Sequence, residues 1–352
     1  MRTAQIQKGL MVAVALLTAV LLWRNGAGVQ AADIDENGRI AFVGNQSGSF
    51  QLYTMNPDGS NMVQITNLAP TALETWTPDF SPDGKRLTFC YGAPDSSGNL
   101  VTEIYVIKID GSNLVQLTHD GLFDCASRWS PDGSHIVFMK QSTRTGRGVV
   151  TTMLPDGSNQ KELTTDLWGV FRSGYTPDGT RILWETQEAG FVSVLWIMNS
   201  DGTNQKRLTA APLKAGLPSS PSRDHVVFMR NQNSPSVVAT FLYKMSLDGS
   251  DIHQLTQPVG SSHDGWPNYS PSRQKIVFTS DRLSSDGSLD IFTMNADGSG
   301  MKRIATGVTV GGCADQNCVN PTWGPSPSEE TSGRAKDRPL RGTLPGLTTP
   351  QK

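Results

Sequence analysis

Two His-Asp-Gly segments hold the side chains of this sequence that are best suited to chemistry. Imidazole and carboxylate groups that converge on one place can bind a divalent cation or a polar ligand. The two segments and the acidic residues near them supply the candidates His119, Asp120, Asp124, His263, Asp264 and Glu74. The alternative interpretation is that these aspartates cap their own loop backbones, as in Asx turns.

The elements that must position these groups are six copies of one sequence unit. Each copy contains an Asp-Gly-(Ser/Thr) turn, with an aliphatic residue six positions before the Asp and an Ile or Leu seven positions after it. In five copies this Ile or Leu is followed directly by Thr. The turns begin at Asp58, Asp110, Asp156, Asp201, Asp248 and Asp297. Such a period, about 45 to 52 residues, indicates a repeat architecture.

A second turn in five of the units, Ser-Pro-Asp-Gly or a relative of it, completes the pattern. Seven residues after its proline stands a large aromatic residue, with an aliphatic residue two positions earlier, and this spacing is typical of one face of a strand. The aromatic residues are Phe89, Phe138, Trp184, Phe228 and Phe278. Each unit therefore predicts four strands, A to D, and radial stacking of the units would bury their faces. We predict an all-β, six-bladed β-propeller of four-stranded antiparallel blades over residues 37–326.

The ends of the repeat region indicate how the ring closes. The first unit begins with a strand B around Ile40 and lacks a strand A, whereas a spare strand A lies near Pro321–Trp323. We expect these two segments to pair within one blade, because closure removes exposed sheet edges that would otherwise favour aggregation.

The lengths of the connections indicate which face carries function. The A–B and C–D connections have nearly constant length, whereas the B–C and D–A connections vary from unit to unit. The two variable sets share one face, here called the loop face, and the constant turns form the turn face. Function usually resides in variable loops on a rigid scaffold. His119 and His263 belong to D–A loops three blades apart, so we expect them to face each other across the pore mouth.

Two segments carry a family resemblance. The run Trp129–Phe138, with Leu195–Thr209 in the next unit, resembles the TolB-type propeller repeat. The resemblance extends over about residues 37–326 and implies the propeller fold. Bacterial TolB also carries a small α/β domain before its propeller; Asp33–Asn37 leads straight into the first strand here, so we expect no counterpart of that domain.

The first 31 residues resemble a secretory signal peptide. Arg2 and Lys8 are followed by an apolar core, Leu10–Trp23, and then by the small-residue site Val29–Ala31. An uncleaved anchor is the alternative, but the apolar run is shorter than the ~20 residues of a membrane span. We therefore expect an exported protein, periplasmic or extracellular, with no transmembrane span in the mature chain. Residues 327–352 are rich in Pro, Gly, Ser, Thr and charge, which predicts a disordered tail.

Charge and cysteine content narrow the partners and the covalent links. The chain has 30 basic and 32 acidic residues and no Lys/Arg stripe, which argues against nucleic acid as a partner. Four cysteines in an exported chain favour disulfides, and we predict Cys313–Cys318 and Cys90–Cys125. Cys90 as a small buried hydrophobic residue is the alternative.

These features favour a monomeric, non-catalytic propeller that binds a protein or a cell-envelope component through its loop face and pore mouth. No catalytic residue and no cofactor is predicted, apart from a divalent cation at the pore mouth with His119 and His263 as its candidate ligands. The resemblance leaves a metal-dependent polyuronide lyase as an alternative, although such lyases collect several histidines around the pore. A glycan-binding propeller would instead use the loop aromatics Trp76, Trp168 and Trp266. The alternative is that Trp residues before strand A pack between blades.

Overall fold

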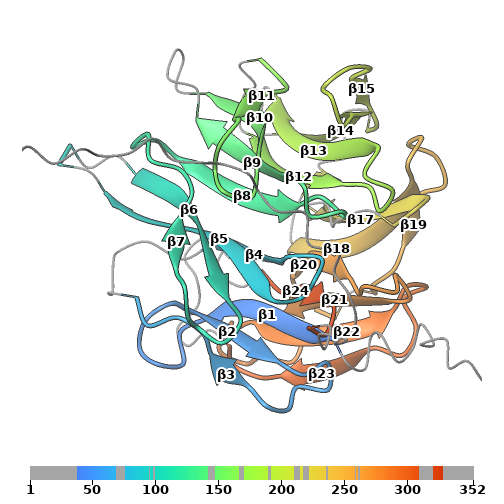
Figure 1. Cartoon of the computed structure of the whole chain (residues 1–352). Helices are drawn as coiled ribbons and strands as arrows, with labels where there is room; N and C mark the ends of the chain where they lie inside the picture. The colour runs from blue at the N-terminus through green and yellow to red at the C-terminus, as the bar shows by residue number, and fades with distance from the viewer. Residues whose placement is uncertain are drawn as a thin grey trace, which may run out of the picture.

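Each of the six sequence units forms one four-stranded antiparallel sheet, and the sheets surround a common axis (Figure 1). The computed structural model describes residues 38–68, 76–94, 96–97, 100–141, 147–165, 170–188, 192–209, 215–216, 222–234, 237–257, 259–260, 262–308 and 320–327. The predicted six-bladed propeller is therefore confirmed. The described part of the chain contains no helix with the length and apolar character of a membrane span.

The strands of each blade run from the axis outward in the order A to D. Blade 1 consists of β24 (Thr322–Gly324), β1 (Arg39–Gly44), β2 (Gln51–Met55) and β3 (Val63–Gln64). Blade 2 consists of β4 (Trp76–Phe80), β5 (Arg86–Pro94), β6 (Leu100–Lys108) and β7 (Val115–Gln116). Blade 3 consists of β8 (Asp124–Trp129), β9 (Ile136–Gln141), β10 (Gly148–Met153) and β11 (Lys161–Glu162).

The second half of the ring repeats this order. Blade 4 consists of β12 (Val170–Tyr175), β13 (Arg181–Glu188), β14 (Val192–Asn199) and β15 (Lys206–Arg207). Blade 5 consists of β16 (Ala215–Gly216), β17 (His225–Ser234), β18 (Val237–Ser246) and β19 (His253–Gln254). Blade 6 consists of β20 (Asp264–Tyr269), β21 (Lys275–Ser280), β22 (Asp290–Asn295) and β23 (Lys302–Ala305).

The ring closes through the last strand of the chain, as the sequence predicted. Strand β24 pairs with β1 in antiparallel register, with Trp323 opposite Ile40 and Thr322 opposite Ala41. Trp323 is buried in a cluster that also contains residues of blade 6. The C-terminal strand thus supplies the inner edge of the N-terminal blade (Figure 1).

Aromatic residues of strands B and C fill the space between blades. The predicted strand B aromatics are 0 or 1% exposed in all five units that carry one. Their rings stack on the neighbouring strand C in four of these blades; Phe89 stacks on Tyr105 and Trp184 on Trp196, both with centroids 5.8 Å apart. Full burial of such a side chain contributes about 1.5–3 kcal/mol to the free energy of folding. The recurring aromatic residue therefore stabilises each blade that carries it.

The six Asp-Gly turns hold successive blades together on the turn face. In the turn at Asp156, Oδ1 accepts hydrogen bonds from the backbone N (3.0 Å) and the hydroxyl (2.6 Å) of Ser158. Gly157 has φ +85°, and a Cβ added there would lie 2.3 Å from the Leu117 carbonyl oxygen of the preceding blade. Only glycine satisfies both the left-handed backbone and this approach. The turns occur where the sequence predicted them, and the aspartate caps the turn.

In five units, a threonine follows strand D, and its side chain supplies a hydrogen-bond acceptor to strand C where strand D no longer pairs. Its hydroxyl accepts a hydrogen bond from a strand C amide, as in Ile104 N to Thr118 Oγ1 at 3.0 Å and Val150 N to Thr164 Oγ1 at 2.9 Å. In blade 6 the corresponding residue is Ala305, and β23 extends so that Ala305 itself pairs with Ile291. The recurrent Thr therefore completes a two-residue edge strand.

Candidate functional site at the loop face

Two seams between blades, three blades apart, are built alike at the loop face. In each, a strand C threonine forms a short parallel bridge to the residue that precedes the next strand A. The threonine hydroxyl donates to the carbonyl of the following aspartate, from Thr102 to Asp124 at 2.9 Å and from Thr240 to Asp264 at 3.0 Å. Asp124 and Asp264 thus begin β8 and β20 at equivalent positions.

At the seam between blades 5 and 6, an arginine neutralises the carboxylate of Asp264. Arg282 donates to both oxygens of Asp264, from Nε at 3.3 Å and from Nη2 at 2.5 Å. The Ser280 hydroxyl adds a third bond at 2.7 Å. Asp264 has no exposed surface, so this bidentate ion pair is the compensation that a buried charge requires.

At the seam between blades 2 and 3, the equivalent carboxylate has no such partner. Asp124 is also 0% exposed, and neither of its carboxylate oxygens accepts a hydrogen bond from the described residues. Carboxylate oxygens of Glu103, Asp120 and Asp124 lie within 4.8 Å of one another. Burial, reinforced by the charge of Asp120, raises the pKa of Asp124 to about 7.

Glu103, which the sequence analysis missed, fixes the loop that carries Asp120. Its Oε1 accepts from the Gly121 amide at 2.8 Å and its Oε2 from the Thr118 hydroxyl at 2.5 Å. Gln51 of blade 1 and Asp290 of blade 6 occupy the same repeat position and also accept amides of their D–A loops. The sequence contained a signal for this role. In three of the six units, a polar residue stands directly before the aliphatic residue of strand C.

One lysine borders the carboxylates of this seam. Lys140 Nζ contacts Asp120 Oδ2 and also donates to Gln160 Oε1 at 2.8 Å. The other oxygen of Asp120 accepts the amide of Leu122 at 3.1 Å. His119, next to Asp120 in sequence, is exposed.

A disulfide crosses the same seam. Cys90 of β5 and Cys125 of β8 are joined with their Cα atoms 5.1 Å apart, and both are buried. This is one of the two pairs expected from the sequence. Cys313 and Cys318, the other pair, lie outside the described residues.

His263 is held by a loop carboxylate. Its Nδ1 lies 2.9 Å from Asp281 Oδ2, and its amide donates to Asp281 Oδ1 at 2.7 Å. Within the described ranges, the one group of three potential metal ligands contains neither His263 nor His119. The candidate side chains of Glu74, Trp76 and Trp168 lie outside the described part of the chain.

Polar side chains cross the central channel. Arg128 of blade 3 donates from Nη1 to Asp79 of blade 2 at 3.0 Å and to Asn268 of blade 6 at 3.3 Å. Trp266 is only 7% exposed, and its ring centroid lies 4.1 Å from the guanidinium of Arg172 in blade 4. Contacts between blades that are not neighbours must pass through the axis. Trp266, a binding-face candidate, packs in the channel, which was the alternative for this residue.

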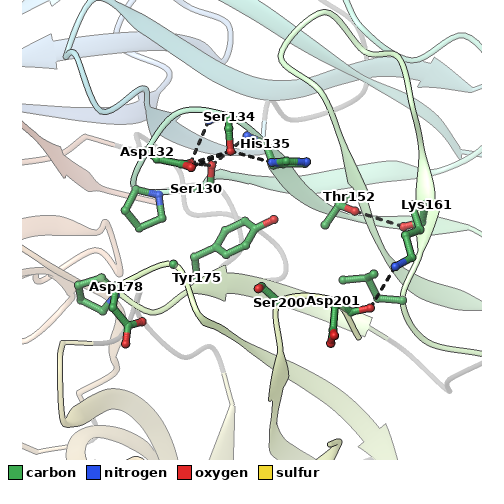
Figure 2. A pocket seen from close by; sticks show the side chains of 14 residues that line it. Ser130, Asp132, Ser134, His135, Thr152, Lys161, Tyr175, Asp178, Ser200 and Asp201 are labelled. Carbon is green, nitrogen blue, oxygen red and sulfur yellow. Dashed lines mark hydrogen bonds between the residues drawn. The ribbon is translucent and has the colours of Figure 1, made fainter. Parts of the chain in front are cut away.

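A pocket of about 650 Å³ lies on the turn face between blades 3 and 4 (Figure 2). Its walls include the A–B turns of both blades, and His135, Lys161 and Tyr175 project toward it (Figure 2). The sequence analysis placed function on the other face. Burial raises the pKa of Tyr175 above its usual range, so this hydroxyl stays protonated.

The acids of this pocket are engaged within their own turns. Asp132 Oδ1 accepts the Ser130 hydroxyl at 2.6 Å and the Ser134 amide at 3.0 Å. These bonds lower the pKa of Asp132 to about 2. Asp178 accepts the Thr176 hydroxyl at 2.6 Å in the same way. The carboxylates therefore cap turns, and the pocket is a seam between two blades.

The architecture defines a closed, six-bladed propeller with a uniform turn face and a loop face whose seams differ from blade to blade. A family model described as the TolB beta propeller domain matches residues 64–242. The chain belongs to this family.

Relatives share shorter segments with this chain. The "Protein TolB homolog" of Chlorobium chlorochromatii is 45% identical over 51 residues, which cover 14% of this chain and 11% of that protein. An uncharacterized protein of Agrobacterium fabrum is 29% identical over 120 residues, 31% of this chain and 38% of that protein. The matches thus span about a tenth and about two fifths of the relatives' own lengths.

Solved structures share the fold at low identity. TolB from Acinetobacter baumannii superimposes with a TM-score of 0.63 at 19% identity, covering 83% of this chain and 67% of that one. A putative TolB from Agrobacterium tumefaciens gives 0.57 at 17%, covering 82% and 99%. A chain of a nidogen/laminin complex gives 0.59 at 11%, also covering 82% and 99%.

Proposed function

We propose that this chain is a non-catalytic binding propeller that recognises a protein or another cell-envelope component on its loop face. The observation that carries the proposal is the difference between the two faces. Six nearly identical Asp-Gly contacts occupy the turn face, whereas the loop face presents groups that belong to single blades. A rigid frame with individual loops is the usual construction of a recognition surface.

Exposed apolar side chains on the loop face support recognition at its surface. Two large apolar side chains of the loop face are well exposed, Val259 at 49% and Leu283 at 59%. Exposed apolar side chains beside polar groups are common anchors of protein interfaces. The similar fold in a nidogen/laminin complex is a further reason to expect a macromolecular partner.

The proposal includes export, which rests on the signal-like sequence of residues 1–31. N-terminal sequencing of the mature protein from its native host should yield a chain that starts near residue 32. A chain that keeps its first residues would contradict cleavage.

The interaction can be tested with matched surface variants. Purified chain is cross-linked to a native envelope fraction, and the captured species is compared between wild type, Leu283→Lys and Leu114→Lys. Leu114 is 43% exposed in a C–D connection, away from the loop face. We expect Leu283→Lys to reduce capture at least fivefold and Leu114→Lys to leave it unchanged.

Two results would overturn the proposal. Loss of capture in Leu114→Lys alone would place the interface on the turn side of the ring. Turnover of polygalacturonate by the purified wild type would show that the chain is an enzyme.

A further inference from the structure

We propose that Glu103, Asp120 and Asp124 form a calcium-binding site at the seam between blades 2 and 3. This site is independent of the proposed partner and involves neither of the two histidines considered in the sequence. Its members come from strand β6, from the D–A loop and from the first residue of β8.

The repeat itself supplies the main argument. Asp124 and Asp264 hold equivalent positions, and their carbonyls accept the same threonine bond. At Asp264 a guanidinium bonds both carboxylate oxygens. At Asp124 the equivalent oxygens are buried and have no hydrogen-bond partner among the described residues. A buried charge without compensation is costly, so a cation is the missing counterpart.

Two of the three carboxylates are oriented by hydrogen bonds from the loop. Glu103 accepts the Gly121 amide and the Thr118 hydroxyl. Asp120 accepts the Leu122 amide. A carboxylate has about four acceptor sites, so these bonds orient the ligands and leave lone pairs for a metal. The Cys90–Cys125 disulfide joins the two blades beside Asp124 and limits movement of the seam.

The charge balance favours a divalent ion. Three carboxylates stand against one ammonium, that of Lys140, which is bonded to Asp120 and shared with Gln160. Two negative charges remain when all three acids are ionised. At the equivalent seam between blades 5 and 6, Phe241 and Gly260 replace Glu103 and Asp120, so one arginine suffices there.

The ligand atoms favour calcium. All donors are oxygens, which hard cations prefer, whereas Zn²⁺ favours nitrogen and sulfur. The ligand oxygens lie within 4.8 Å of one another, a span that calcium–oxygen bonds of about 2.3–2.6 Å can bridge. Calcium accepts irregular sets of oxygen ligands, whereas magnesium demands near-ideal octahedral geometry and dehydrates reluctantly.

The test is calorimetric titration of the full chain with CaCl₂ at pH 7.5, after treatment with a chelator and exchange into metal-free buffer. We expect one calcium ion per chain and weaker binding of MgCl₂. Asp124→Asn and Glu103→Gln should each weaken calcium binding at least tenfold. Asp156→Asn, at an exposed turn, should bind as wild type does.

Both site variants should fold. Asn matches the shape of Asp124, and Gln51 already performs in blade 1 the loop-holding role of Glu103. Circular dichroism checks the fold, and calcium should raise the melting temperature of wild type and Asp156→Asn but not of Asp124→Asn. No calcium binding by wild type, equal affinity in Asp124→Asn, or tighter binding of magnesium than of calcium would overturn the proposal.

Discussion

At the scale of single residues, the loop face shows one repeat position in two electrostatic states. Asp264 is buried with a bidentate arginine, and Asp124 is buried among further carboxylates. The backbone around both is the same, because the same Thr-to-carbonyl bond fixes it. The fold therefore tolerates a buried carboxylate at this position, and the side chains around it decide what compensates the charge.

The Asp264–Arg282 pair gives a direct prediction. Arg282→Ala should lower the free energy of unfolding by about 3–5 kcal/mol, because it leaves a fully buried carboxylate without its partner. Adding Asp264→Asn to this variant should recover part of the loss, since it removes the stranded charge. Urea unfolding of the single and double variants measures both effects. A double variant less stable than Arg282→Ala would contradict the assignment.

The turn carboxylates give a prediction about acid. The bonds from Ser130 and Ser134 hold the pKa of Asp132 at about 2, below its usual value of about 4. A lowered pKa stabilises the folded chain above about pH 4, and this contribution is lost as the pH falls towards 2. The Ser134 hydroxyl also bonds Asp132, at 2.8 Å to Oδ1 and 2.9 Å to Oδ2, and Ser134→Ala removes it. The variant should therefore raise the pKa of Asp132, which carbon-detected NMR titration of the carboxyl group measures. An unchanged pKa would show that this hydroxyl does not bond the carboxylate in solution.

Sequence reasoning at this scale found some of the site. The equivalence of Asp124 and Asp264 follows from counting to the next aromatic residue. Glu103 was missed because it stands inside a strand, and its partners come from a loop whose path the sequence does not give. For Trp266 the sequence left contact with a ligand and packing between blades both open, because spacing places a residue on a strand but does not say which groups cross the channel to cover it.

At the scale of elements, the Asp-Gly turn is both a hairpin and a contact between blades. The turn glycines have φ between 82° and 94°, and an added Cβ would come within 2.0–3.1 Å of the preceding blade's carbonyl oxygen. The same contact occurs between Gly59 and Ile304, where the first blade meets the last. The sequence predicted the turn, but its role between blades required the ring.

A matched pair of glycine variants separates these two roles. Gly48 has φ +89° with open space around a Cβ, whereas Gly157 has φ +85° and a carbonyl oxygen 2.3 Å away. Gly48→Ala should cost about 1–2 kcal/mol from backbone strain alone. Gly157→Ala should cost about 1–3 kcal/mol more, because the neighbouring blade must shift. Equal losses in chemical denaturation would show that the contact between blades contributes nothing.

At the scale of the whole molecule, closure was predictable and the channel was not. A missing strand A at one end and a spare one at the other specify which segments pair, and β24 with β1 confirms it. The channel contacts join residues far apart in the sequence, such as Arg128 and Asn268. They depend on the diameter of the closed ring and on side-chain lengths, which no repeat spacing encodes.

The central claim is that a closed ring, completed by its last strand, holds the two faces in place. The most direct test is calorimetric unfolding of two truncations, one that removes residues 328–352 and one that removes 320–352. The first should melt as the full chain does, because β24 and its pairing with β1 remain. The second should melt at a much lower temperature or fail to fold, because it loses buried Trp323 and exposes the edge of β1. Equal melting temperatures for the two truncations would contradict closure through β24.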